Sequence, residues 1–138
     1  MSKDNCIFCK IAKGEIPSAT IYEDSHFRVM MDINPATKGH CLIIPREHFD
    51  NIYDLDGETA GKIFSLATCI ARALKDALGC EGMNIVQNNG EIAGQTVMHF
   101  HLHLIPRYKD DEVKVGWVPH ASDEKELEEL RRAIKAAI

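Results

Sequence analysis

The chain has 138 residues, 45% hydrophobic and 27% charged, which fits one globular domain with a core of its own. Its formal net charge of −5 argues against binding to DNA or RNA, where a basic surface is expected. Because no apolar run could span a bilayer and the first residues do not resemble a signal peptide, we expect a cytoplasmic protein that does not bind membranes.

The first elements are a short helix and a hairpin. Phe8 to Lys13 can form one or two helical turns, and Gly14 is a natural stop. Two apolar runs follow, Ala19–Tyr22 and Phe27–Met31, and the polar residues Glu23, Asp24 and Ser25 lie between them. This arrangement predicts two strands joined by a tight turn.

The middle of the chain changes from a strand to a long helix. His40–Ile44 reads as a strand that ends at Pro45, since proline cannot donate to a β-ladder. From about Glu58 to Leu78, apolar residues recur at steps of three and four, which predicts an amphipathic helix. Asp56 is a plausible N-cap of this helix, and Gly79 is a plausible residue just after its C-terminal end.

Two further strands and a last helix complete the chain. Met83–Asn88 and Val97–Ile105 are separated by a Gly- and Asn-rich loop, and Asp123–Ile138 begins acidic and ends basic, as suits a helix dipole. Strands joined by hairpins with one helical insertion indicate an α+β domain. We expect a five-stranded antiparallel sheet with one long helix and short terminal helices, in one domain over residues 1–138 whose tail is 109–138.

The most informative segment holds three histidines in strict alternation, His99, His101 and His103. Side chains alternate across a strand, so we expect the three imidazoles on one face, about 6.5 Å apart. Imidazole titrates near neutral pH, so one ring could attack a phosphate while another holds a proton. Alternating histidines are also good zinc ligands, and periodicity alone leaves both interpretations open.

The sequence around these histidines resembles the histidine triad (HIT) family. The resemblance covers about residues 5 to 108 and is nearest to bacterial-type members of the Hint branch. The motifs that carry the resemblance occur in the same order as in the family, and together they are specific for it. They are Cys6–Ile11, Gly14–Pro17, Asp32–Pro35, Gly39–Pro45, Gln87–Gly90 and His99–Ile105.

The resemblance implies a nucleotidyl hydrolase of the nucleoside phosphoramidase type. His101 would be the nucleophile, attacking the α-phosphorus of a purine nucleotide or nucleoside phosphoramidate to form a nucleotidyl-histidine intermediate. His103 would contact the phosphate and assist the leaving group, and His40 would complete the histidine cluster. A diadenosine polyphosphate hydrolase and a nucleotide-binding regulatory module with little turnover are the alternatives.

The same resemblance implies the nucleotide contacts. Asp32 would accept from the ribose hydroxyls, although it could instead cap the turn near Pro35. Asn88, Gln95 and Thr96 would contact the phosphate. An apolar base pocket would be lined by six residues, three of which (Ile11, Ile33 and Leu42) could equally be core; the six are Ile7, Phe8, Ile11, Met30, Ile33 and Leu42.

Cys6 and Cys9 form a Cys-x-x-Cys pair, which can be a redox motif, two ordinary cysteines or half of a zinc site. We favour a structural zinc site that is not required for chemistry, for which the resemblance supplies His48 and His99 as further ligands. His99 would then not act freely as an acid or base. The other three cysteines, Cys41, Cys69 and Cys80, lack such spacing, and we expect buried thiols.

The resemblance also implies a homodimer, formed through the long helix and the fourth strand and carrying a continuous ten-stranded sheet. The tail is longer than in the shortest Hint members. Family C-termini can reach toward the partner's active site, so Trp117 either contributes there or anchors the tail.

Overall fold

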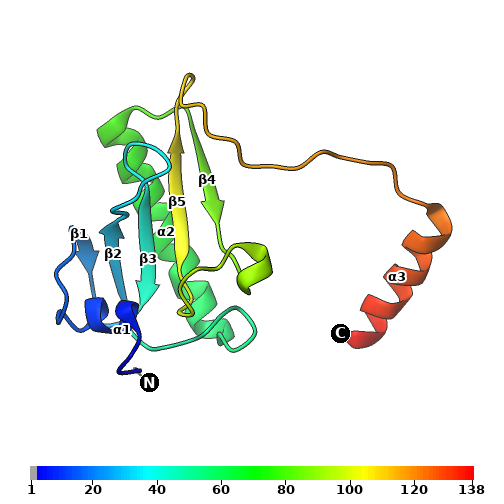
Figure 1. Ribbon diagram of the computed structural model, residues 1–138, viewed down its shortest axis with the longest axis horizontal. Coiled ribbons are helices and arrows are strands. Elements are labelled where there is room, and N and C mark those ends of the chain that lie inside the picture. The colour runs from blue at the N-terminus through cyan, green and yellow to red at the C-terminus, as the bar shows by residue number, and fades with distance from the viewer. Residues whose placement is uncertain (1–2) are drawn as a thin grey trace.

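The computed structural model describes residues 3–138 (Figure 1). A short helix, a sheet and a long helix form one body, from which the C-terminal segment extends. In chain order the elements are α1 Ile7–Ala12, β1 Thr20–Glu23, β2 Phe27–Met31, β3 Cys41–Pro45, α2 Gly57–Leu78, β4 Gly82–Val86, the 3₁₀ turn η1 Glu91–Ala93, β5 Leu102–Arg107 and α3 Glu124–Ala137.

The strands form one antiparallel sheet in the order β1-β2-β3-β5-β4. The predicted five-stranded antiparallel sheet with one long helix and terminal helices is confirmed. β3 and β5 are central, and their register pairs Leu42 with His103. β4 pairs with β5 alone among the described strands, so its other edge is free.

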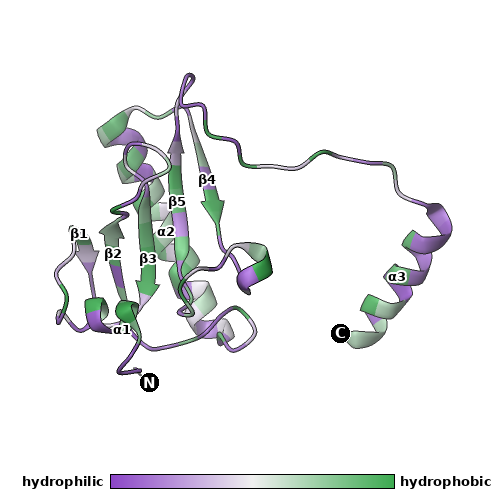
Figure 2. Cartoon of the chain, in the orientation of Figure 1, coloured by the Kyte–Doolittle hydropathy of each residue, from purple (hydrophilic) through white to green (hydrophobic). Residues whose placement is uncertain are grey.

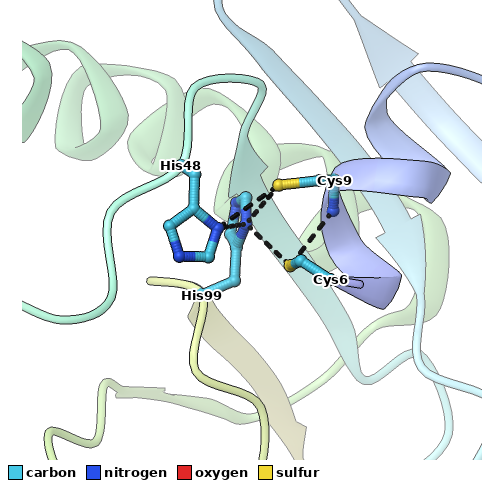
Figure 3. A group of neighbouring side chains, drawn as sticks. All are labelled: Cys6, Cys9, His48 and His99. Atoms are coloured by element: carbon cyan, nitrogen blue, oxygen red, sulfur yellow. Dashed lines mark hydrogen bonds between the residues drawn. The ribbon is translucent and has the colours of Figure 1, made fainter. Parts of the chain in front are cut away.

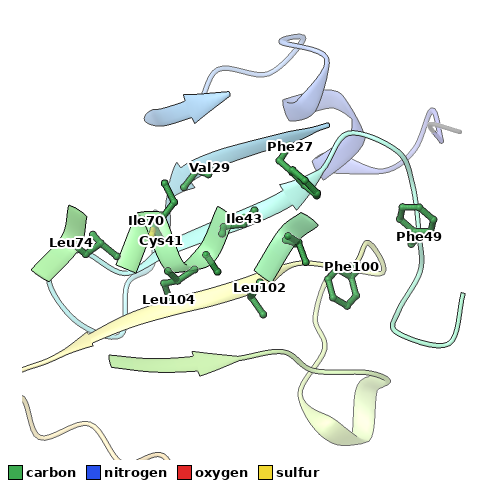
Figure 4. Packing of buried hydrophobic residues seen from close by; sticks show 12 residues of the cluster. Phe27, Val29, Cys41, Ile43, Phe49, Ile70, Leu74, Phe100, Leu102 and Leu104 are labelled. Atoms are coloured by element: carbon green, nitrogen blue, oxygen red, sulfur yellow. The ribbon is translucent and has the colours of Figure 1, made fainter. Parts of the chain in front are cut away.

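Helix α2 covers one face of the sheet. It begins where the Asp56 side chain accepts from Thr59 N and ends at Gly79, whose φ of 64° is readily adopted by glycine. Its buried residues follow the helical period and pack on alternate strand residues (Figure 4). This main core comprises Phe27, Val29, Cys41, Ile43, Phe49, Ile63, Ala67, Ile70, Leu74, Phe100, Leu102 and Leu104.

Helix α1 covers part of the opposite face. The strand residues between those of the main core, such as Leu42 and Ile44, point toward α1 because side chains alternate along a strand. They form a second cluster with Phe8, Cys9 and Met30. β3 is therefore buried along its whole length, and the N-terminal segment lies on the side of the sheet away from α2.

The predicted strand Val97–Ile105 is wrong in its first half, because β5 begins only at Leu102. The neighbouring strands offer no partner before that point: β4 ends at Val86, opposite His103, and the β3 pairing ends with Ile43 opposite Leu102. His99 and His101 therefore lie in an irregular segment just before the strand, with bends at residues 97–99. The backbone N–H of Phe100 instead donates to the Phe49 carbonyl at 2.6 Å.

One smaller prediction also needs correction. Cys41 and Cys80 are buried as expected, but Cys69 is exposed because it lies on the solvent side of α2. Strand β3 ends at Pro45 as predicted, and Pro45 pairs with Phe27.

The C-terminal segment leaves the body and ends in α3 (Figure 1). Every residue of α3, all within the described chain, is exposed or half-exposed. Among residues 3–138, no helix combines the length and apolar character that crossing a bilayer requires.

Candidate active site

A cavity of about 380 Å³ opens between α1, β2, β3 and the histidine segment. Its volume lies in the range of small-molecule sites. All six residues expected to form a base pocket line it: Ile7, Phe8, Ile11, Met30, Ile33 and Leu42. Ile33 is 88% exposed, so it is a cavity-wall residue and not core. His101, His103, Asp32 and Thr96 line the same cavity, which places polar groups beside an apolar wall.

His101 is held in a single tautomer. Its Nδ1 lies 2.7 Å from the His99 carbonyl oxygen, and a carbonyl only accepts, so Nδ1 carries the hydrogen. Nε2 is left with the lone pair. The ring packs against Phe8 in a T-shaped contact, with centroids 5.0 Å apart. The side chain is thus fixed as a neutral imidazole with one free nucleophilic nitrogen.

His40 and His103 form a directional pair. The Ala36 N–H donates to His40 Nδ1 at 2.9 Å, so neutral His40 has its hydrogen on Nε2. That nitrogen lies 2.9 Å from His103 Nδ1 and donates to it, which leaves the His103 hydrogen on Nε2. The His101 and His103 rings are neighbours, with centroids 4.9 Å apart. The cavity therefore presents a lone pair on one imidazole beside an N–H on the next.

Burial keeps these imidazoles neutral. It lowers the pKa of His103 to about 4, helped by the positive charge that His101 and His40 would carry if protonated. Burial also lowers the pKa of His40, against the opposing effect of the Asp32 carboxylate. Burial lowers the pKa of His101 as well, although its hydrogen bond to the His99 carbonyl opposes the shift. At neutral pH the cluster carries no charge of its own.

Asp32 caps a turn and also lines the cavity. One oxygen, Oδ1, accepts from the Asn34 N–H at 2.8 Å and caps the turn. The other, Oδ2, lies 3.5 Å from His40 Nε2 on the cavity side. Capping therefore orients the carboxylate while one oxygen remains able to accept from a ligand hydroxyl.

Of the three residues expected at the phosphate, Asn88, Gln95 and Thr96, only Thr96 lines the cavity. Gln95 is buried, and its amide donates to the carbonyls of Asp50 and Val97 while accepting from Gly90 N–H. It shapes the loop, and both hydrogens of its amide are engaged. Thr96 lines the cavity, whereas Asn88 lies outside its lining and reaches the Gly94 carbonyl at 3.5 Å.

Cys6, Cys9, His48 and His99 converge on one point (Figure 3). Sulfur-to-nitrogen distances are 3.4 Å for Cys6–His99, 3.3 Å for Cys9–His48 and 3.5 Å for Cys9–His99, and the two Nδ1 atoms are 3.2 Å apart. Tetrahedral zinc with bonds of about 2.0–2.3 Å would set its ligand atoms roughly 3.3–3.8 Å apart. The donor set and its spacing fit such an ion.

The hydrogen bonds behind this cluster turn both lone pairs inward. His48 Nε2 donates to Asp50 at 2.6 Å, and His99 Nε2 donates to the Pro45 carbonyl at 2.8 Å. Each Nδ1 therefore holds a lone pair, and two lone pairs face each other at 3.2 Å. The two lone pairs can be met by the thiol hydrogens of Cys9 and Cys6, at 3.3 and 3.4 Å, or by a cation shared among all four ligand atoms.

Sequence reasoning missed the groups that orient these rings. Asp50 stands two residues after His48, a short spacing that could have signalled a carboxylate partner. The Ala36 N–H has no sequence signal, because it depends on how residues 34–39 fold back over His40.

A sequence model of the HIT domain matches residues 13–110. The chain belongs to the HIT family. It is 49% identical to Protein hit of Bacillus subtilis, over 88% of this chain and 85% of that one. It is 37% identical to an adenosine 5′-monophosphoramidase of Schizosaccharomyces pombe, covering 97% and 98% of the two chains. It is also 37% identical to an adenylylsulfatase of Arabidopsis thaliana, over 79% of this chain and 55% of that one.

Solved structures of HIT proteins share the fold. A family member from Bacillus anthracis superposes with a TM-score of 0.92 at 43% identity, covering 99% of both chains. One from Streptococcus mutans gives 0.95 at 43% identity, covering 99% of this chain and 87% of that one. A zinc-bound histidine triad protein from Mycobacterium smegmatis gives 0.77 at 37% identity, covering 97% and 98%.

Proposed function

We propose that this HIT protein is a nucleoside phosphoramidase that cleaves its substrate at the α-phosphorus, with His101 as the nucleophile. The observation that carries the proposal is the 2.7 Å bond from His101 Nδ1 to the His99 carbonyl, which leaves a lone pair on Nε2 beside a nucleotide-sized cavity. Relatives that are nucleotide hydrolases by name, including the monophosphoramidase, support hydrolase activity.

The first step forms a bond between His101 Nε2 and the α-phosphorus while the bond from phosphorus to the leaving amine breaks. His103 Nε2–H hydrogen-bonds to a water that passes a proton from solvent to the departing nitrogen. The imidazolium formed on His101 retains its Nδ1–H, and the His99 carbonyl stabilises the new positive charge. His40 holds the neutral His103 ring in place by its 2.9 Å bond, so His103 Nε2 keeps its hydrogen throughout.

In the second step, water attacks the phosphorus and the bond to His101 Nε2 breaks. The attacking water releases a proton to solvent, and His101 returns to its starting tautomer as a neutral imidazole. In this scheme Asp32 accepts from the ribose hydroxyls, and the apolar wall of Ile7, Phe8 and Ile33 receives a purine base. Thr96 contacts the phosphate from the rim.

The Cys6–Cys9–His48–His99 cluster is proposed as a structural zinc site. The inward lone pairs, the tetrahedral spacing and the zinc-bound relative support it. Bound there, the ion would tie α1 to the segment before β5 and would leave the reacting nitrogens outside its ligand set. The homodimer and the cytoplasmic location expected from the sequence stay predictions.

Mass spectrometry tests the reaction class directly. The protein is mixed with an adenosine phosphoramidate, quenched in alkali, digested and mapped. The expected result is an adenylyl adduct on the peptide containing His101, formed and lost at rates that match turnover. Turnover with no adduct under rapid quench would overturn the proposed intermediate. Faster turnover of a diadenosine polyphosphate would favour that alternative substrate class.

A further inference from the structure

The loop of residues 32–40 joins β2 to β3 and ends at His40, just before the apolar strand β3 (Figure 2). The loop bonds to His40 in two ways. The Thr37 carbonyl accepts from the His40 N–H at 3.2 Å, and the Ala36 N–H donates to His40 Nδ1 at 2.9 Å. The backbone and the ring of His40 are therefore both held by the loop, so whatever fixes the loop also orients this ring.

Thr37 fixes the loop to β5. Its side chain is buried, and its hydroxyl donates to the Pro106 carbonyl at 2.6 Å. Carbonyls alternate between the two edges of a strand, and the Arg107 carbonyl accepts from an N–H on the β4 side, so the Pro106 carbonyl faces β3. The β3–β5 register begins only at Cys41, opposite Leu104, which is two residues before Pro106. Thr37 thus supplies from the loop the donor that a strand amide supplies further along the ladder.

A second anchor of the loop comes from Tyr108, the residue after β5. Its hydroxyl donates to the Lys38 carbonyl at 2.6 Å, and the Lys38 ammonium lies 5.5 Å from the centre of its ring. Both anchors thus come from the C-terminal end of β5, the strand that carries His103. The loop and His103 therefore share one support, which fixes the His40 ring relative to the His103 ring.

The contact between His40 and His103 can be made with either polarity. When His40 carries its hydrogen on Nε2, it donates to His103 Nδ1, and His103 presents an N–H to the cavity. When His40 carries its hydrogen on Nδ1, its Nε2 accepts from His103 Nδ1, and His103 presents a lone pair instead. The Ala36 N–H is compatible only with the first arrangement. Asp32 Oδ2 favours it as well, from a longer distance of 3.5 Å to His40 Nε2.

We infer that Thr37 is a positioning residue that sets the hydrogen positions of this histidine pair. Its bond to Pro106 holds the Ala36 N–H against His40 Nδ1, which directs an N–H, in place of a lone pair, from His103 into the cavity. The tautomers depend on geometry alone, whereas the effect on turnover rests on the proposed phosphoramidase function. In that reaction a lone pair on His103 Nε2 would repel the phosphate oxygens and could not donate to the water beside the leaving nitrogen.

Nitrogen NMR of the full chain, labelled with ¹⁵N-histidine and held at about pH 7.5, tests the inference, because the two nitrogens of a neutral ring differ widely in shift according to which one carries the hydrogen. Thr37→Val keeps the shape of the side chain and removes its donor. Thr37→Ser keeps the donor, and Thr68→Val removes an exposed hydroxyl on α2 as the matched control. Backbone amide spectra check that each variant is folded, and turnover of an adenosine phosphoramidate is measured on the same samples.

In the wild type, Thr37→Ser and Thr68→Val, we expect the hydrogen on Nε2 of both His40 and His103. In Thr37→Val we expect roughly half of the molecules to carry the reversed arrangement, read from averaged shifts. Its kcat should fall by the fraction that has lost the His103 N–H, about twofold, with KM within about threefold of the wild type.

Unchanged tautomers in Thr37→Val, or the same reversal in Thr37→Ser, would overturn the inference. Reversal without any loss of kcat would support the positioning role and count against the proposed reaction. If Thr37→Val does not fold, Tyr108→Phe decides, since it removes the second anchor at an exposed position. A smaller reversal in the same direction would support the inference, and unchanged tautomers in that variant would contradict it.

Discussion

The backbone carbonyl of His99 accepts the Nδ1 hydrogen of His101 at 2.7 Å. His99 is at the same time a member of the Cys6–Cys9–His48–His99 cluster through its own Nδ1. One residue thus joins the proposed metal site to the proposed nucleophile. The ring of His99 fixes the local backbone, and that backbone selects which nitrogen of His101 is free. Phe8 contacts both rings and ties α1 to the same point.

Removing a cysteine of the cluster should release zinc and loosen the site without abolishing chemistry. For Cys9→Ser we expect loss of about one zinc per chain by elemental mass spectrometry, a fall in Tm of more than about 10 °C and a roughly tenfold lower kcat. The matched control is Cys69→Ser, since Cys69 is exposed on α2. Complete loss of activity in folded, zinc-free protein would instead place the metal in the reaction.

Replacing the nucleophile should separate binding from turnover. We expect His101→Asn to lower kcat at least about 10⁴-fold because the attacking nitrogen is lost. Adenosine monophosphate affinity, measured by calorimetry, should stay within a few-fold, since the apolar wall and Asp32 are untouched. His26→Asn, at an exposed position, is the control. Residual turnover near the wild-type rate would rule out covalent catalysis by this residue.

Asp32→Asn should weaken the recognition of ribose. The amide keeps an oxygen for the turn but accepts less strongly than a carboxylate, so we expect KM to rise about tenfold. With a 2′,3′-dideoxyadenosine substrate, the wild type and the variant should differ by less than twofold, because no ribose hydroxyls remain to be bound. Equal losses on both substrates would contradict the contact and point to a general defect in the turn.

The acid limb of the pH profile should lie well below the usual imidazole range. Burial lowers the pKa of His103 to about 4, so its neutral form persists as pH falls below 6.5. The pKa values of His40 and His101 are lowered too. We therefore expect the acid limb of kcat/KM of the free enzyme to be centred below pH 6.5. A limb centred near 6.5 would show that the rings are ordinarily solvated.

Gly39 is a position where a side chain cannot be accommodated. Its φ is 91°, and a Cβ there would lie 2.3 Å from Leu78 Cδ1 and 3.3 Å from Pro106 Cγ. We expect Gly39→Ala to lower the free energy of unfolding by about 2–3 kcal/mol in urea titration. Gly61→Ala, inside α2 with open space around it, should raise it by up to about 1 kcal/mol. If Gly39→Ala were more stable than Gly61→Ala, the close packing around Gly39 would be contradicted.

The sequence predicted elements whose signals are local. The three- and four-residue spacing along α2, with Asp56 and Gly79 at its ends, identifies a helix without any tertiary information. The apolar wall of the cavity and the Cys/His cluster followed from the family resemblance. What failed depended on neighbours: alternation of histidines suggested a strand from Val97, yet a strand needs partners, and β4 has already ended at Val86.

Gln95 and Ala36 illustrate the same limit within the site. The resemblance placed Gln95 at the phosphate, but its amide is engaged by the Asp50 and Val97 carbonyls, and only the folded loop reveals this. The N–H of Ala36 sets the tautomer of His40, yet any residue other than proline would supply that donor. The role of a backbone N–H or carbonyl depends on the folded geometry, so the residue type in the sequence does not predict it.

The absence of positive charge from the imidazole cluster bears on how the product departs. A phosphoramidate linkage carries a single negative charge at phosphorus, whereas a freed nucleoside monophosphate gains a second one near neutrality, with a pKa of about 6. Neutral rings beside the Asp32 carboxylate offer that dianion little attraction. We expect the pocket to bind the phosphoramidate substrate more tightly than the nucleoside monophosphate product. Inhibition by accumulated monophosphate should therefore weaken as the solution becomes more alkaline.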